Sequence, residues 1–373
     1  MNETEYKEAL DFIVYLCACA INKVTPQSNN KVNLDHVFEI TQKHMITSIV
    51  GQMLQRASIP SEKFKKSVAM AQRKTVILEY EVNRVTGAFE KQGIWYMPMK
   101  GVVLKEFYPG YAMREMCDCD VLVDETRASD VKTIMETLGF QTTSFGENKD
   151  DCYILPPSSN FEIHRTLFSD IHEENLYHYY LNVKDRLVKD VDNDYGYHFT
   201  AEDFYVYMIA HDFKHYKYGG TGLRSLLDTY VFLKSTSLDM DYVQSEIQKI
   251  GISTFECRNR ELACKLFDQI PLSKDEQNEL AYYVSSGTFG TVDHRVENYV
   301  QKKGRIRYLL TRVFGPIGKN NPFREQFKKK YAFFFRHPLL LPFLPFYRFL
   351  KAVFASPKRL KNELRALKRT RKR

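Results

Sequence analysis

The chain has 373 residues, a formal net charge of +8 and 44% hydrophobic residues, so it is long enough for two or three compact units and too apolar for large-scale disorder. Its seven cysteines are an odd number without disulfide-like spacing, which argues against a disulfide-rich secreted fold. The first residues lack the basic start and apolar core of a secretion signal, so we expect a cytoplasmic protein.

The first ninety or so residues are predicted to be helical, because apolar residues recur at intervals of three and four. Asn33 and Asp35 are candidate caps, since short polar side chains accept hydrogen bonds from the exposed N–H groups of a first turn. The expected helices cover residues 8–21, 33–44 and 63–90. We therefore expect a helical N-terminal domain over residues 1–92.

Residues 93–170 change to short strands that alternate with helices. A strand from Tyr96, a turn, a short helix and a loop lead to a second strand that ends at Val123, and a helix from Glu125 to Leu138 follows. Further strands are expected at residues 140–144, 152–155 and 160–165. The sequence therefore predicts an α+β fold, in which a small mixed sheet is flanked by helical regions on both sides along the chain.

Two aspartates open the second strand of this segment. Side chains on a strand alternate between its two faces, so Asp118 and Asp120 are expected to project together. Two adjacent carboxylates repel each other, and burying such a pair is costly unless a cation neutralises it. Oxygen ligands beside a phosphate-sized turn suit Mg²⁺ better than zinc, so we expect a magnesium site here.

A third acid lies on a later strand, where Glu162 and His164 share one face. Three carboxylates from two neighbouring strands are what a two-metal phosphoryl-transfer site requires. The strands that carry Asp120 and Glu162 are therefore expected to be neighbours in the sheet.

The turn between the first strand and the short helix is suited to an anion. Lys100 and Gly101 precede a helical run from Val102 to Phe107, whose first N–H groups have no partner within the helix. Gly101 allows close approach of a ligand, and Lys100 adds a positive charge. This turn is the expected phosphate-binding element.

Together these features resemble the bacterial nucleotidyltransferase family of the DNA polymerase β-like superfamily. Within it, the chain is most similar to an uncharacterised subgroup often associated with surface-polysaccharide or peptide-modification gene clusters. The resemblance rests on the K-G turn, the short helix, the loop with Arg114, the D-x-D strand and the later E-I-H strand, and it covers residues 96–167 well. It implies that Asp118, Asp120 and Glu162 are the catalytic and metal-binding residues, and that they hold two Mg²⁺ ions.

The resemblance also implies which residues bind the nucleoside triphosphate. Gly101 takes the role of the family's G-G or G-S turn, with Lys100 beside it, and Arg114 touches the triphosphate or orients the D-x-D loop. The chain departs from the family at this turn, because Lys100-Gly101-Val102 lacks the usual serine.

The implied function is transfer of a nucleotidyl group from a nucleoside triphosphate to an acceptor hydroxyl on a sugar, peptide or protein. The subgroup's gene context extends this expectation to cell-surface polysaccharide biosynthesis. An alternative is a catalytically inactive, nucleotide-binding partner in an envelope assembly, which the missing turn serine would allow.

A second alternative is a His-Asp metal phosphohydrolase. His211 and His215 lie four residues apart in a predicted helix, His211 is followed by Asp212, and Asp228 follows as a later carboxylate. A hydrolase would leave the D-x-D strand unexplained. The competing interpretation is that His211, His215 and Asp228 stabilise helix packing or line the nucleotide cleft, and Arg224 is a further candidate for contacting phosphate.

The remaining chain is expected to form a helical C-terminal domain over residues 171–322, followed by an aromatic, proline-rich segment and a basic tail over 323–373. Residues 351–373 hold ten lysines and arginines against one acid, a net charge of +9, so the rest of the chain is near −1. The basicity belongs to the tail, and specific nucleic acid binding is not expected.

The aromatic segment contains three prolines, and its uninterrupted apolar run is expected to be too short to span a bilayer. An aromatic and leucine-rich patch followed by a basic helix suits the inner, anionic surface of a membrane. The prediction is peripheral membrane association. The alternative is that the segment packs on the helical domain while the tail is merely solvated.

Overall fold

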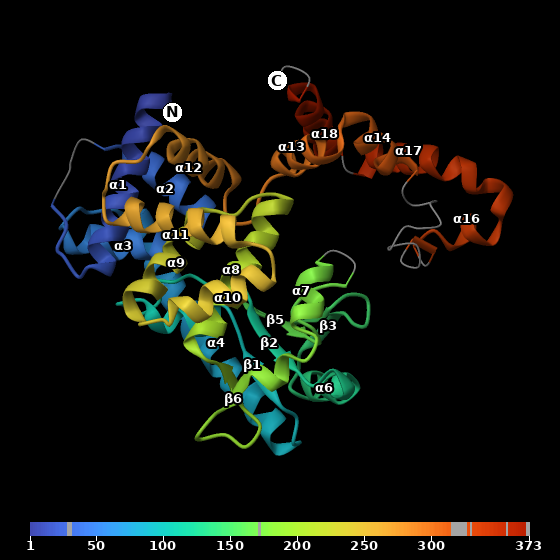
Figure 1. The fold of residues 1–373 in the computed structure, drawn as a ribbon, viewed down its shortest axis with the longest axis horizontal. Coiled ribbons are helices and arrows are strands. Elements are labelled where there is room, and N and C mark those ends of the chain that lie inside the picture. The colour runs from blue at the N-terminus through green and yellow to red at the C-terminus, as the bar shows by residue number, and fades with distance from the viewer. Residues whose placement is uncertain (28–31, 171–172, 315–326, 329, 356, 371–373) are drawn as a thin grey trace. The chain divides into compact units, whose positions relative to one another are not determined.

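The computed structural model describes residues 1–27, 32–170, 173–314, 327–328, 330–355 and 357–370. The chain has the predicted α+β fold, in which helices precede and follow a five-stranded mixed sheet (Figure 1). The N-terminal helices are α1 (Glu3–Ile21), α2 (Leu34–His44), α3 (Thr47–Arg56) and α4 (Glu62–Lys91).

The N-terminal helices begin where polar side chains can cap them. Asn2 and Glu5 form a reciprocal capping box on α1, and the Asn33 side chain accepts a hydrogen bond from the Asp35 N–H at the start of α2. The expected cap at Asn33 is therefore confirmed. Helix α3 was not predicted as a separate helix, and most of its residues are buried, polar ones included.

The central segment contains the sheet and its short helices. These are β1 (Tyr96–Pro98), α5 (Gly101–Leu104), η1 (Lys105–Phe107), β2 (Cys119–Val123), η2 (Glu125–Arg127), α6 (Ala128–Thr137), β3 (Gln141–Ser144), β4 (Asp150–Leu155) and β5 (Ser159–His164). The strand order is β1-β2-β5-β4-β3, and β2 with β5 is the parallel pair, whereas the other neighbours are antiparallel. The small mixed sheet predicted from the sequence is confirmed.

One face of the sheet is the apolar core of this segment. Cys119, Val121 and Phe161 point toward α4 and α6, where Leu78 and Val131 are among the buried residues of the same cluster. Because side chains alternate along a strand, Asp120 and Glu162 project from the opposite face. The sheet thus separates an apolar side from a side that carries the acids.

Later elements complete the fold. They are α7 (Glu174–Tyr179), η3 (Val183–Arg186), β6 (Leu187–Lys189), β7 (Tyr197–Phe199), α8 (Ala201–Tyr218), α9 (Leu223–Ser235), α10 (Met240–Lys249), α11 (Ser253–Phe267), α12 (Lys274–Ser286), α13 (Val292–Lys303), α14 (Arg305–Phe314), α16 (Ala332–Arg336), η5 (Pro338–Phe343), α17 (Leu344–Ala355) and α18 (Pro357–Arg369). Strands β6 and β7 form a separate two-stranded antiparallel sheet.

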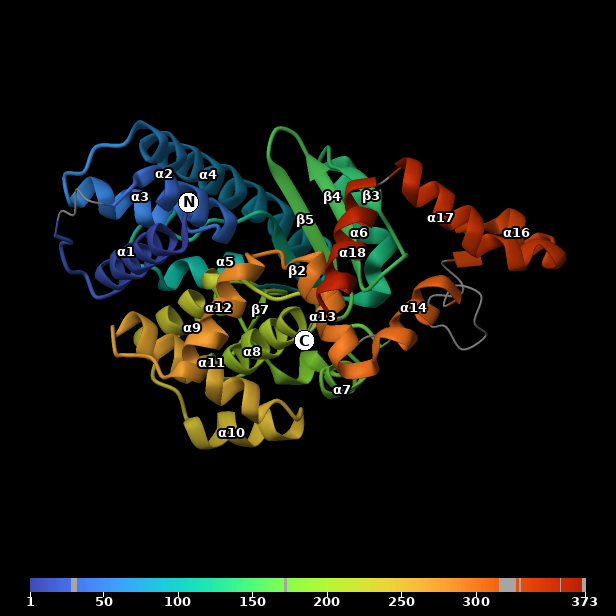
Figure 2. The same cartoon turned by 90° about the horizontal axis from the view of Figure 1, so that it is seen from above.

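The N-terminal helices lie beside α9 and α11, although these segments are far apart in the sequence (Figures 1 and 2). Buried His44 at the end of α2 accepts a hydrogen bond from the Leu223 N–H at 3.1 Å, and Tyr230 of α9 lies 3.3 Å from the side-chain nitrogen of Asn22. His44 is therefore a packing residue, and burial together with nearby Lys43 lowers its pKa to about 3.

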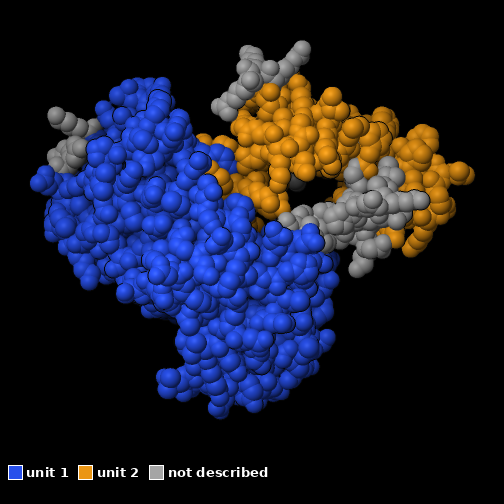
Figure 3. Space-filling model, viewed as in Figure 1, with its two compact units in different colours: residues 1–213, 222–284 blue, residues 214–221, 285–373 orange. Residues whose placement is uncertain are grey.

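The chain divides into two compact units (Figure 3). Unit 1 comprises residues 1–213 and 222–284, and unit 2 comprises residues 214–221 and 285–373. The expected domain limits at residues 92 and 170 both fall inside unit 1, so the finer division of the chain stays a prediction.

Unit 2 contains the C-terminal helices. Its small apolar cluster is formed by Val296 of α13 with Ala366 and Leu367 of α18. Glu363 of α18 is buried and accepts hydrogen bonds from Arg312 and Tyr308. The basic helix α18 is thus packed along one side.

The segment Pro338–Ala355 is a helical stretch of 18 residues in the described part of unit 2, long and apolar enough to cross a membrane by length and composition. The sequence predicted an uninterrupted apolar run too short to span a bilayer, with three prolines that would break a spanning helix, whereas the described helical stretch contains Pro338, Pro342 and Pro345. Length and composition are weak evidence for a span, and this stretch has few buried residues.

Candidate active site

The two strands that carry the predicted acids are adjacent and parallel. Asp120 on β2 lies directly opposite Glu162 on β5. The expectation that these strands are neighbours is therefore confirmed. Asp118 lies one residue before β2 and is half-buried, so the aspartate pair spans the start of the strand instead of lying wholly within it.

Lys100 lies at the start of α5 with an unusual backbone. Its φ is +47° and its ψ is −115°, a region that residues with a side chain rarely adopt and that typically costs about 1–3 kcal/mol. The Lys100 ammonium lies 2.5 Å from the Asp120 Oδ1 atom. The ion pair with Asp120 thus accompanies a strained backbone at Lys100.

His164 at the end of β5 joins this group. Its Nε2 atom lies 2.7 Å from Asp120 Oδ1, and its Nδ1 atom lies 2.8 Å from the Lys149 Nζ atom. The imidazole is buried, and burial together with the Lys149 charge lowers the His164 pKa to about 4. Asp120 therefore accepts from both Lys100 and His164.

The protonation of the three carboxylates differs because their partners differ. Burial alone would raise the pKa of Asp120, but Lys100 and the His164 hydrogen bond hold it far below its usual range. Burial and the charge of Asp120 raise the pKa of Glu162 to about 7. Burial and Asp120 also raise the pKa of Asp118. The site therefore holds more negative charge than its own cations neutralise.

The ligand atoms of Asp120, Glu162 and His164 all lie within 4.8 Å of one another, a spacing that could hold a metal ion. Two of these donors are carboxylates, which suit Mg²⁺ or Mn²⁺, whereas the imidazole nitrogen also suits softer metals. Glu162 is the most accessible of the three, with 30% of its side chain exposed. Because burial and the charge of Asp120 raise the pKa of Glu162, a cation bound to this donor set would favour its ionised form.

Arg114 is held by a second buried ion pair. Its Nε and Nη2 atoms donate to Asp228 of α9 at 2.9 and 3.0 Å, and the Tyr108 hydroxyl donates to the same carboxylate at 2.7 Å. The Nη1 atom of Arg114 faces the phosphate turn, because a Cβ placed on Gly101 would lie 2.6 Å from it. Gly101 is therefore needed for the close approach of the Arg114 guanidinium.

Arg224 of α9 is half-buried and donates to the Glu115 carbonyl at 3.2 Å, in the loop before β2. Burial and the nearby Arg114 charge lower its pKa. The charge of Arg224 in turn favours ionised Asp118. This residue thus fixes the loop that carries Asp118, and it was predicted only as a candidate phosphate contact.

The residues proposed for a phosphohydrolase do not gather into a metal site within the part of the chain that the structure describes. Asp228 accepts hydrogen bonds from Arg114 and Tyr108. Neither Asp228 nor His211 belongs to the set of possible metal ligands formed by Asp120, Glu162 and His164. The Asp212 Oδ2 atom is buried without a hydrogen-bond partner among these residues, and burial with Asp228 nearby raises its pKa to about 8. Burial and the Asp228 charge therefore both favour the neutral form of Asp212.

Sequence reasoning named Asp118, Asp120, Glu162, Lys100, Gly101 and Arg114, and all six lie in unit 1. It did not assign roles to His164 or Lys149. The alternation of side chains along the strand indicated that His164 shares a face with Glu162. Its contact with Asp120 also depends on the register between β2 and β5, which the sequence did not give.

A family model described as an uncharacterised nucleotidyltransferase matches residues 30–268. The matched region contains the whole five-stranded sheet and continues through α11 to residue 268. No curated protein and no solved structure matches the chain.

Proposed function

The chain belongs to the family of uncharacterised nucleotidyltransferases, and from this premise we propose that it moves a nucleotidyl group from a nucleoside triphosphate to an acceptor hydroxyl. One observation carries the proposal beyond the family. Asp120 and Glu162 face each other on parallel strands, and the pKa of Glu162 is raised to about 7. Such a pair is poised for a divalent cation, as phosphoryl transfer requires.

The donor set fits magnesium. Asp118, Asp120 and Glu162 would hold two Mg²⁺ ions, because carboxylate oxygens of Asp120 and Glu162 lie within 4.8 Å of each other and Asp118 is near enough for Asp120 to raise its pKa. Bound magnesium would supply the positive charge that lowers the pKa of the acceptor hydroxyl and stabilises the leaving pyrophosphate. His164 orients Asp120 through the 2.7 Å contact, as an outer partner of a ligating carboxylate commonly does.

The remaining residues bind the triphosphate. Lys100 exchanges its contact with Asp120 for the phosphates, and the outward Nη1 atom of Arg114 donates to them beside Gly101. These two cations replace the hydroxyl of the missing turn serine.

In the reaction, the acceptor oxygen forms a bond to the α-phosphorus while the bond from that phosphorus to the bridging oxygen of the β-phosphate breaks. Pyrophosphate leaves with the electron pair of the broken bond. Glu162, the most accessible acid of the set, takes up the acceptor proton.

The experiment measures pyrophosphate release from ATP, GTP, CTP and UTP with Mg²⁺, over a panel of sugar, peptide and protein acceptors. Wild type should release pyrophosphate, and the double variant Asp118→Ala/Asp120→Ala should not. Asp130→Ala, which removes an exposed carboxylate of α6, serves as the matched control. Equal release by the double variant and wild type would refute the assignment.

The same assay separates the alternatives. Mg²⁺-dependent nucleotide binding without turnover would favour an inactive partner in an envelope assembly. Activity lost in His211→Ala but kept in Asp118→Ala would favour the phosphohydrolase. The acceptor classes and a place in cell-surface polysaccharide biosynthesis rest on the subgroup resemblance alone.

We also propose that unit 2 associates peripherally with an anionic membrane at the cytoplasmic face. Exposed large apolar side chains follow one another along α16, η5 and α17: Phe333, Leu339, Leu340, Phe343, Phe346, Tyr347, Phe349, Leu350 and Phe354. The sequence from residue 327 to 362 contains nine lysines and arginines and no acid. Apolar side chains in a basic frame suit an anionic bilayer surface.

The structure changes which residues carry this membrane proposal. Helix α18 packs Ala366 and Leu367 into the cluster of unit 2, so the exposed apolar residues lie before it. In flotation with phosphatidylserine vesicles, Phe346→Ser/Phe354→Ser should lose binding, whereas Phe289→Ser, an equally exposed change elsewhere in unit 2, should not. Equal flotation of all three proteins would remove the segment from the proposal.

A further inference from the structure

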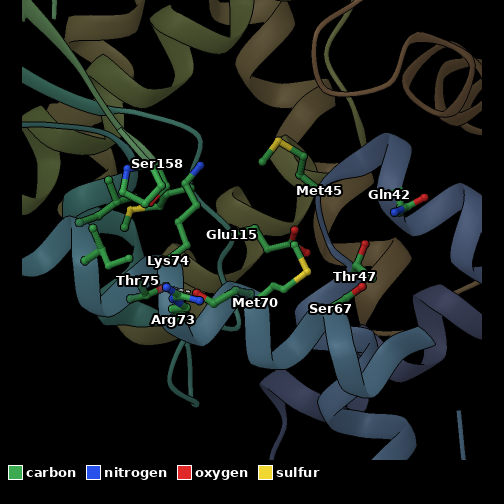
Figure 4. Close-up of a pocket in the computed structure, with 15 residues that line it drawn as sticks. Gln42, Met45, Thr47, Ser67, Met70, Arg73, Lys74, Thr75, Glu115 and Ser158 are labelled. Atoms are coloured by element: carbon green, nitrogen blue, oxygen red, sulfur yellow. Dashed lines mark hydrogen bonds between the residues drawn. The ribbon is translucent and has the colours of Figure 1, made fainter. Parts of the chain in front are cut away.

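A cavity of about 530 Å³ opens in unit 1 beside the loop that precedes β2 (Figure 4). It is enclosed by the turn between α2 and α3, by α4, and by the turn between β4 and β5. Its lining is largely apolar and includes Met45, Met70 and Met116. A volume of this size suits a small molecule, and methionine side chains adapt to irregular apolar shapes.

The charges in the lining favour an anion. Arg73 and Lys74 of α4 both line the cavity, against a single carboxylate, Glu115. Glu115 is already committed, because it accepts the Ser48 N–H at 2.7 Å near the start of α3. The Lys74 ammonium donates to the Cys117 carbonyl at 3.1 Å, and an ammonium carries three donors.

A second polar group points to a ligand. The Ser158 Oγ atom is buried and has no hydrogen-bond partner among the described residues, and Ser158 lines the cavity (Figure 4). Buried hydroxyls are normally hydrogen-bonded, so this one is suited to a polar atom of a bound molecule. The cavity therefore combines an apolar body, two cations and an unpartnered hydroxyl.

The cavity adjoins the candidate active site. The Met116 side chain forms part of its wall, and a Cβ placed on Gly101 would lie 3.3 Å from the Met116 sulfur. Lys74 holds the carbonyl of the residue directly before Asp118. On the other strand, Pro157 and Ser158 precede β5, which carries Glu162. The segments that lead into both carboxylate-bearing strands thus form part of the cavity wall.

We propose that this cavity binds the acceptor, and that the acceptor is an amphipathic anion. Its apolar body lies among the methionine side chains, its acidic group meets Arg73 and Lys74, and its hydroxyl is directed toward Asp118, which follows the loop that forms part of the cavity wall. The role of this ligand as the acceptor rests on the proposed nucleotidyl transfer. Its chemical class, an amphipathic anion, rests on the lining of the cavity.

The test uses 2-naphthoate, an apolar body with one carboxylate, and its uncharged analogue 2-naphthamide, titrated calorimetrically into the full chain. Naphthoate should bind saturably and at least about tenfold more tightly than the amide. Ala71→Phe fills the cavity and should weaken naphthoate binding about tenfold or more. Arg73→Glu, on the exposed side of α4, should also weaken it, which covers the case in which Ala71→Phe misfolds.

Lys66→Glu is the matched control, because it reverses a charge on the same helix outside the cavity lining and should retain wild-type affinity. The proposal is overturned by a lack of saturable binding to wild type, by equal affinity for the amide, or by unchanged affinity in both cavity variants. Binding confined to this cavity in a chain without nucleotide turnover would refute the nucleotidyl transfer and leave the ligand class standing.

Discussion

Unit 1 holds two clusters of buried charged residues, one around Asp228 and one around Asp120. Their residue types are similar, but their carboxylates differ in how completely they are paired. Around Asp228, Arg114 donates two hydrogen bonds and Tyr108 a third, so the carboxylate has a full set of partners. Around Asp120, Lys100 is the permanent positive charge within contact distance among the described residues, because burial lowers the pKa of His164 to about 4. Burial and the charge of Asp120 raise the pKa values of both Glu162 and Asp118.

The difference separates a structural ion pair from a binding site. A buried pair with all its hydrogen bonds satisfied positions the elements that carry it, here the loop of Arg114 and helix α9. Acids in excess of their cations are costly unless a ligand completes them. The comparison therefore assigns the Asp228 cluster to architecture and the Asp120 cluster to metal and nucleotide.

The largest effect is expected when the Asp228 cluster is broken. Asp228→Ala leaves the Arg114 guanidinium buried without its partner, which should reduce the free energy of unfolding by about 3–5 kcal/mol. Urea unfolding of the two proteins measures this change. Asp130→Ala, at an exposed position, should change stability by less than about 0.5 kcal/mol. A loss below about 1 kcal/mol in Asp228→Ala would contradict the architectural role.

The second effect is the pH dependence of stability without metal. The pKa of Glu162 is raised from 4.5 to about 7, so the folded state binds more protons than the unfolded state between these values. The stabilisation is complete below pH 4.5 and is lost as pH rises through 7, by roughly 3 kcal/mol. Urea unfolding in EDTA from pH 5 to 8 measures the decline.

Glu162→Gln should make that decline shallower. The pKa of Asp212, raised to about 8, acts in the same direction and remains in the variant, so the informative quantity is the difference between the two proteins. Identical slopes would show that Glu162 is not perturbed.

The third prediction tests the close approach of Arg114, from the Asp228 cluster, to Gly101. Gly101→Ala would place a methyl group 2.6 Å from Arg114 Nη1, which the bidentate pair with Asp228 prevents from moving freely. We expect a loss of about 2 kcal/mol in stability and a higher KM for the nucleotide. Gly87→Ala in α4, where nothing lies within 4 Å, should be neutral or stabilising. Matching behaviour of the two variants would argue against the close approach.

The smallest effect concerns the orientation of Asp120. His164→Gln removes the imidazole that contacts Asp120 Oδ1, and we expect Mn²⁺ affinity to fall about tenfold, as for other outer partners of metal ligands. Thermal unfolding in EDTA should separate this effect from a general loss of stability. Unchanged affinity would make His164 a packing residue.

Local patterns were sufficient to predict the sheet, the D-x-D strand and the K-G turn, because period-two alternation and turn residues report on neighbouring positions. The partners of these residues were not predictable in the same way. Asp228 lies 114 residues beyond Arg114, and the contact of His164 with Asp120 requires the register of β2 with β5. A shift of one residue would turn Glu162 to the opposite face.

The packing of the basic tail was also not predictable from the sequence. Helix α18 places Ala366 and Leu367 against Val296 of α13, a contact between segments that are far apart in the chain. Tertiary contacts of this kind, which no local pattern encodes, decide which side of a helix is buried.

The most direct test of the central claim is Mn²⁺ binding to the full chain, followed by electron paramagnetic resonance of the free ion. Wild type should bind saturably, and Asp120→Asn and Glu162→Gln should each lose at least about tenfold in affinity. Asp228→Asn, the equivalent change in the structural cluster, should bind as wild type does. Equal binding by all four proteins, or no binding by any of them, would contradict the assignment of the metal to β2 and β5.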